Sequence, residues 1–194
     1  MRKTILSLMT IAVVIPVVFA ACQDSAVSEE KGIAMTKKEM VKRGAYLVNT
    51  IGCDDCHSPK RMGPNGPEII PELRLSGYPA SRPITKTNID VLKKGWMLLS
   101  DDLTTAVGSW GQSFAANLTS DPTGTGNWKE EQFIKAIREG KYKGLDNTRP
   151  LLLPMPWFVY KNLTDDDLKS IFAFLQTTKP VKNVVPAPRS FIQL

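Results

Sequence analysis

The stretch that decides the fold is IGCDDCHSPK, residues 51 to 60, in which two cysteines and a histidine fall within five positions. This histidine is the only one among the 194 residues of the chain. A redox disulfide, a structural metal site and a covalently attached haem can each use such a cluster. The other residues of the chain decide among these three chemistries.

The metal and disulfide interpretations both lack partners elsewhere in the sequence. A structural zinc site needs four donors, and beyond Cys53, Cys56 and His57 the chain offers only Cys22. A thioredoxin-like disulfide needs a βαβ unit around its cysteines, which the sequence does not show, and such a disulfide does not require His57. Haem c uses all three residues, because the cysteines bind the two vinyl groups as thioethers and the histidine reaches the iron. The motif therefore predicts one covalent haem c.

The N-terminus predicts export from the cytoplasm. MRKTILSLMTIAVVIPVVFAAC, residues 1 to 22, has a basic start, an apolar stretch and small residues before Cys22. The apolar stretch is shorter than the roughly 18 residues that spanning a membrane needs, so residues 1–21 are predicted to be a signal peptide. FAAC resembles the bacterial lipobox, which predicts a lipid on Cys22; ordinary cleavage is the alternative. We expect a lipid-anchored protein of the bacterial cell envelope, facing the periplasm or the exterior.

Charge and composition argue for one domain with no nucleic-acid partner. Without residues 1–21, which hold two basic residues, the chain has 25 − 2 = 23 basic and 19 acidic residues, a net charge of +4. No basic cluster with interleaved aromatic residues occurs, which excludes typical nucleic-acid binding. Polar residues 22–34 are predicted to be a flexible tether, residues 35–183 one folded domain, and residues 184–194 a C-terminal tail.

Capping signals and helical periodicity predict three helices. Thr36 and Glu39 form a capping box at the start of a helix that runs directly into the motif. Asn127 and Glu130 form a second capping box, and Thr164 caps a third helix with three aspartates in its first turn. The chain is therefore predicted to be mainly α.

A long excursion, residues 59–112, follows the motif. Residues 61–83 are rich in proline and glycine and are predicted to form an irregular loop. Residues 95–110 contain two short apolar runs and predict a small β-hairpin.

The second axial position has a methionine candidate. With His57 used, no other histidine is present, and Met is the soft donor most often paired with His in cytochromes c. The mature chain contains Met35, Met40, Met62, Met97 and Met155. Met155 lies between Pro154 and Pro156, which stiffen an extended segment, so we predict Met155 as the ligand. Coordination by Met97 and an open iron are the alternatives.

The order of these features resembles that of class I cytochromes c. RGAYLVNTIGCDDCHSPK, SFAANLTSDPTGTGNWKEEQFIKAIREGK and LPMPWFVYKNLTDDDLKSIFAFLQTTKPV are similar to bacterial cytochromes c related to the cytochrome subunits of periplasmic dehydrogenases, and cover roughly half of the mature chain. The resemblance implies a class I cytochrome c fold in which Cys53, Cys56, His57 and Met155 bind the haem.

The resemblance also implies how two helices pack. Helix 36–49 is expected to cross helix 165–177, with Gly44 allowing close approach and Tyr46, Phe172 and Leu175 packed at the crossing.

The expected function is electron transfer and not catalysis. A haem iron with two axial ligands has no vacant position, and the sequence shows no nucleophile–base pair or phosphate loop; Asp54 and Asp55 are interpreted as a solvated turn. The partners are then a redox donor and acceptor, such as a dehydrogenase, an oxidase or another cytochrome. If Met155 is not bound, a five-coordinate haem sensor or a peroxidase-like enzyme is the alternative. If the excursion 59–112 is a docking surface, the chain is a dehydrogenase subunit and not a free carrier.

Four further residues are predicted around the haem. The carbonyl of Pro64 is the expected acceptor for the second ring N–H of His57. Trp128, Arg149 and Asn117 are the predicted donors to the haem propionates.

Overall fold

The helix that leads into the motif begins where its capping residues predict. In the computed structural model, which describes residues 35–194, α1 spans Lys37–Thr50. The Thr36 hydroxyl accepts the amide of Glu39 at 3.3 Å, and the Glu39 carboxylate accepts the amide of Thr36 at 2.8 Å. This capping box is confirmed. The predicted signal peptide and tether, including Cys22, lie outside the described residues.

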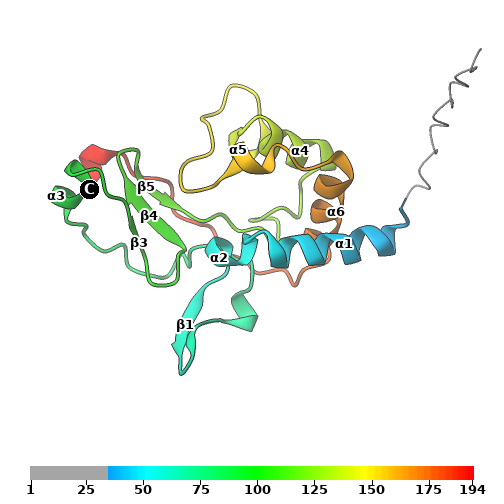
Figure 1. The fold of residues 1–194 in the computed structure, drawn as a ribbon, viewed down its shortest axis with the longest axis horizontal. Coiled ribbons are helices and arrows are strands. Elements are labelled where there is room, and N and C mark those ends of the chain that lie inside the picture. Colours follow the sequence, from blue (N-terminus) through cyan, green and yellow to red (C-terminus); the bar gives the residue numbers. More distant parts are fainter. Residues whose placement is uncertain (1–34) are drawn as a thin grey trace, which may run out of the picture. The chain divides into compact units, whose positions relative to one another are not determined.

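Helices lie at both ends of the described chain, and the short strands lie between them, in the segment after α2 (Figure 1). The remaining helices are α2 (Cys53–His57), α3 (Ile89–Lys93), α4 (Glu130–Arg138), α5 (Trp157–Tyr160) and α6 (Asp165–Leu175). The strands are β1 (Lys60–Gly63), β2 (Gly66–Ile69), β3 (Leu98–Leu99), β4 (Thr105–Gly108) and β5 (Gly111–Phe114). Short 3-10 turns span Pro71–Leu73, Tyr142–Gly144 and Phe191–Gln193. The mainly α expectation is therefore correct only in part.

Helix α1 crosses α6 at close range, as expected. A Cβ atom at Gly44 would lie 1.9 Å from the carbonyl oxygen of Ser170, so only glycine fits at this crossing. Phe172 and Leu175 are buried in the hydrophobic core, as predicted. The expectation for Tyr46 is wrong, because its side chain is 66% exposed. Two residues turn an α-helix by about 200°, so Gly44 and Tyr46 cannot face the same neighbour.

The excursion after the motif contains two small antiparallel sheets. The predicted hairpin is present as β3 paired with β4, and β5 extends it to three strands. The irregular loop predicted for residues 61–83 is wrong in its first part, where β1 and β2 pair from Lys60↔Ile69 to Gly63↔Gly66. Gly66, at φ 117°, has the positive φ that helps to close this two-residue turn.

The two later helices that the sequence predicts are both present, and the start of the first was predicted wrongly. Thr164 caps α6, as predicted, and it also exchanges hydrogen bonds with Asp167. The capping box predicted from Asn127 and Glu130 is wrong, since α4 begins at Glu130 with Lys129 as a cap that makes no side-chain hydrogen bond. The preceding residues form turns in which the Trp128 amide donates to Thr125, and this shifts the helix start beyond Asn127.

The C-terminal segment returns along the excursion. The side chain of Asn183 bonds the backbone of Ser76, Tyr78 and Ala80, and the backbones of Arg189 and Gln112 exchange two hydrogen bonds. In Figure 1 the β3–β5 sheet and helices α4, α5 and α6 lie at opposite ends of the 35–194 unit, with α2 between them. Among residues 35–194, no helix has the length and apolar character needed to cross a membrane.

Candidate haem site

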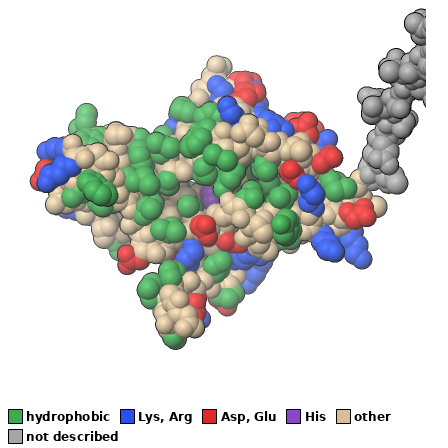
Figure 2. Space-filling model, viewed as in Figure 1, with side chains coloured by type: hydrophobic (Ala, Val, Ile, Leu, Met, Phe, Trp, Pro, Cys, Tyr) green, Lys and Arg blue, Asp and Glu red, His purple; other side chains and the backbone are tan. Residues whose placement is uncertain are grey.

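A cavity of about 310 Å³ lies beside α2 and gathers residues from distant parts of the chain. Apolar side chains provide most of its wall, and Figure 2 shows hydrophobic side chains around a hollow in which the histidine is visible. The predicted site residues within the described chain all line it: Cys53, Cys56, His57, Asn117, Trp128, Arg149 and Met155. Folding thus brings together residues separated by up to about a hundred positions.

The imidazole of His57 is held in one orientation. Its Nδ1 lies 2.7 Å from the carbonyl oxygen of Ala116, and the amide of Gly77 donates to the His57 carbonyl at 2.8 Å. Burial lowers the pKa of His57, which favours the neutral ring. If Nδ1 carries the proton and donates to Ala116, Nε2 keeps a lone pair suited to a metal.

The acceptor predicted for this ring is wrong. Pro64 lies in the turn between β1 and β2, whereas the carbonyl bonded to His57 belongs to Ala116. Ala116 is 59 residues from His57 in the sequence, and a backbone carbonyl leaves no signature in residue type.

The side chains of Cys53 and Cys56 lie at one side of the cavity. Cys53 and Cys56 form no disulfide, and both line the cavity from α2. Burial raises the pKa of Cys53 to about 12 and also raises that of Cys56. Gly52, in the left-handed region at φ 84°, makes the bend that separates this short helix from α1.

Met155 reaches the same cavity from the loop before α5. The hydroxyl of Ser113 donates to the Leu153 carbonyl at 2.6 Å, and the Trp157 amide donates to the Met155 carbonyl at 2.9 Å, so both sides of the methionine are fixed. Of the methionines in residues 35–194, only Met155 lines the cavity; Met97 is 48% exposed on the excursion. Ser113 is a positioning residue that sequence reasoning missed.

The three predicted propionate donors differ in their surroundings. Arg149 packs on the ring of Tyr142 with its guanidinium carbon 4.0 Å from the ring centroid, and burial lowers its pKa. Within residues 35–194 it forms no ion pair with a carboxylate, so it remains suited to an anionic group in the cavity. The side-chain amide of Asn117 instead donates to Thr123 and Val181, which ties it to the C-terminal segment.

Asp54 does not lie in a solvated turn, contrary to the expectation. Its side chain is only 13% exposed and pairs with the guanidinium of Arg74 at 2.7 Å, while the Ser58 hydroxyl donates to it at 2.6 Å. Asp55 is exposed, as predicted. Asp54 therefore helps to anchor the motif helix.

The donor set and the wall fit haem c. Two thiols, a neutral imidazole and a thioether line one mostly apolar cavity, and these are the groups that attach and coordinate a haem of this type. The half-buried cation of Arg149 offers a partner for a propionate.

Comparison with known proteins agrees with this chemistry. The chain is similar to cytochrome subunits of bacterial dehydrogenases. It is 36% identical over 151 residues to the cytochrome c subunit of the quinone-linked alcohol dehydrogenase of Gluconobacter oxydans, a match covering 77% of this chain and 24% of that protein. It is 28% identical to the fructose dehydrogenase cytochrome subunit of Gluconobacter japonicus, over 81% of this chain and 25% of the relative. It is also 28% identical to the gluconate 2-dehydrogenase cytochrome c subunit of Pantoea cypripedii, over 73% of this chain and 24% of the relative.

The chain thus spans about a quarter of the length of these curated relatives. No protein-family profile matches it.

Proposed function

We propose that this protein transfers single electrons through one haem c attached to Cys53 and Cys56, with His57 and Met155 as axial ligands. The observation that carries the proposal is the cavity that all four residues line. When bound, the haem supplies a one-electron iron couple, which His/Met ligation places at a higher potential than bis-histidine ligation does.

The protein's own residues set the surroundings of that couple. The Ala116 carbonyl orients the His57 ring, and Ser113 holds the loop that presents the Met155 thioether. Arg149 and Trp128 line the cavity wall and are the residues proposed to pair with the propionates. Because the Met155 thioether would occupy the iron position left open by His57, the proposed role is carriage of electrons and not conversion of a substrate.

The proposed partners follow from the similarity to dehydrogenase cytochrome subunits. We assign the electron donor to a dehydrogenase and the acceptor to an oxidase or another cytochrome, with the chain acting as a free carrier or as a subunit. We further propose that a lipid on Cys22 holds the protein at a membrane of the bacterial envelope. The lipobox-like FAAC sequence supports this location.

The sixth iron position is the point at which the proposal is tested. Wild-type reduced protein should bind carbon monoxide poorly, and its oxidised form should show a low-spin spectrum with the weak near-infrared sulfur-to-iron band. Met155→Ala should open the iron, remove that band and lower the reduction potential, because the soft sulfur favours Fe(II). Met97→Ala is the matched control, since Met97 lies outside the cavity.

Two results would refute the assignment. Avid carbon monoxide binding by the wild type would favour a five-coordinate haem sensor or a peroxidase-like enzyme. An open iron in Met97→Ala together with an unchanged Met155→Ala would place the ligand on the excursion.

A further inference from the structure

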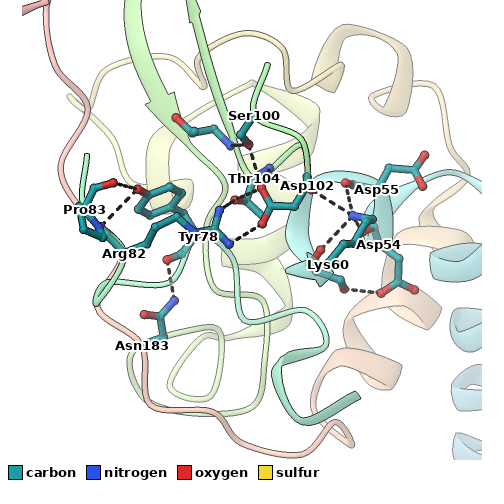
Figure 3. A network of polar contacts seen from close by, with 12 residues as sticks. Asp54, Asp55, Lys60, Tyr78, Arg82, Pro83, Ser100, Asp102, Thr104 and Asn183 are labelled. Carbon is teal, nitrogen blue, oxygen red and sulfur yellow. Dashed lines mark hydrogen bonds and ion pairs between the residues drawn. The ribbon is translucent and has the colours of Figure 1, made fainter. Parts of the chain in front are cut away.

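The ammonium group of Lys60 lies in a cage of main-chain carbonyl oxygens. Its Nζ is 2.6 Å from the oxygen of Asp55, 2.9 Å from that of Ser58 and 3.1 Å from that of Asp54. A fourth oxygen, that of Asp102, lies at 3.2 Å (Figure 3). Within residues 35–194, Lys60 forms no ion pair with a carboxylate.

Three of these oxygens belong to the helix that carries the haem motif or to the residue after it. A five-residue helix such as α2 has little stability of its own, and its last carbonyls have no partners within the helix. An ammonium group has three donors and a positive charge, so it satisfies these carbonyls and interacts favourably with the C-terminal end of the helix.

The strand that carries Lys60 and the turn at Asp102 are each held by other contacts. Lys60 opens β1, where it pairs with Ile69. The carboxylate of Asp102 is buried and accepts hydrogen bonds from Arg82 at 2.7 Å, Ser100 at 2.8 Å and Thr104 at 2.9 Å (Figure 3). Lys60 therefore links α2 to a hydrogen-bonded turn that lies more than forty residues further along the chain.

We propose that Lys60 is a positioning residue for the haem site. It holds the last turn of α2 against the 100–104 turn and places a fixed positive charge on the carbonyls of Asp55 and Ser58, the residues that flank Cys56 and His57. This inference rests on the proposed function. A fixed cation disfavours the more positive, oxidised state of a nearby redox centre, so Lys60 raises the reduction potential. By holding the carbonyls of α2 it also limits movement of the ligand-bearing turn.

The experiment compares Lys60→Met with wild type and with Lys94→Met, a neutralised lysine that is exposed and lies outside the cavity wall. Covalent haem content, midpoint potential and hydrogen exchange of the α2 amides are measured on the full-length holoprotein. Lys60→Met should lower the potential, shifting the Fe(III)/Fe(II) equilibrium by about two- to tenfold, as expected for loss of one nearby charge. Exchange of the Ser58 amide, which donates to Asp54 within this turn, should accelerate, and Lys94→Met should behave as wild type.

Lys60→Arg separates the effect of the charge on the potential from the effect of the hydrogen bonds on α2. It also covers the case in which the methionine variant does not fold. It keeps the charge but replaces the compact ammonium by a planar group that does not fit the cage, so the potential should stay near wild type while α2 exchange accelerates. Wild-type potential and exchange in Lys60→Met would overturn the inference, and so would unchanged exchange in Lys60→Arg. Absence of covalent haem from the wild type would instead refute the proposed function, because that measurement does not involve Lys60.

Discussion

Replacing Gly44 by alanine tests the helix crossing that supports the haem motif. The added Cβ would meet the Ser170 carbonyl oxygen at 1.9 Å and the Phe174 Cβ at 2.8 Å. Ordinary contact begins near 3.4 Å, so α1 and α6 must separate by about 3.4 − 1.9 = 1.5 Å along this direction. The obstacle is backbone, which cannot rotate away as a side chain would.

Two opposing effects determine how far the free energy of unfolding falls in Gly44→Ala. Alanine is favoured over glycine inside a helix by about 1 kcal/mol. Overpacking a close contact costs about 1 to 3 kcal/mol, and a backbone overlap of this depth belongs at or above the upper end of that range. We therefore expect the free energy of unfolding to fall by about 2 kcal/mol or more, and the melting temperature by roughly 4 to 8 °C for a domain of this size.

Urea unfolding of the haem-loaded protein, followed by circular dichroism, measures this change. Lys42→Ala is the control, because Lys42 is exposed on the same helix and the change should alter stability by less than about 0.5 kcal/mol. A Gly44→Ala protein as stable as wild type would show that the helices do not approach as closely as described.

Three further predictions concern attachment, location and acid stability. Cys53→Ala with Cys56→Ala should abolish covalent haem, and haem that still resists acidic organic extraction would contradict the motif assignment. Cys22→Ser should release the protein from the membrane fraction or leave the precursor unprocessed; unchanged processing and membrane association would count against the lipobox. Burial raises the pKa of Asp102, but hydrogen bonds from Arg82 and its neighbours outweigh this and hold it at about 2, below the ordinary 3.8. Ionised Asp102 therefore adds about 2 kcal/mol to the free energy of unfolding above pH 4, and this stabilisation is lost as the pH falls toward 2. Unfolding of Asp102→Asn measured across that range should lack this part of the acid destabilisation, and an identical pH profile would refute it.

The sequence predicted best what local chemistry controls. The Thr36 and Thr164 caps depend on hydroxyl and carboxylate groups three residues apart, and both form as expected. The Cys and His spacing likewise identified residues that the fold places on one cavity, and Met155 joins them there.

The errors concern contacts between distant backbone groups. The Ala116 carbonyl and the Ser113 hydroxyl hold His57 and the Met155 loop, but their roles depend on the path of the excursion and not on a recognisable motif. The β1–β2 hairpin was missed because prolines weaken the strand pattern, although such short edge strands tolerate them. Tyr46 was misplaced because it lies two positions after Gly44, and the helical rotation of about 200° turns its side chain away from α6.

The burial of the Cys53 thiol has a consequence for the order of events during maturation. In the folded chain burial raises its pKa to about 12, so almost none of it is thiolate at neutral pH, and its side chain faces a cavity whose wall comes mostly from segments that follow it in the sequence. The reactive form of a cysteine is the thiolate, and an extended chain restores it to an ordinary pKa and full access. Attachment of the proposed haem would therefore be favoured early, while the chain is still open. On the proposed assignment, the cavity wall would close only after the thioethers had formed, whereas a chain that folded first would keep the haem from the Cys53 thiol.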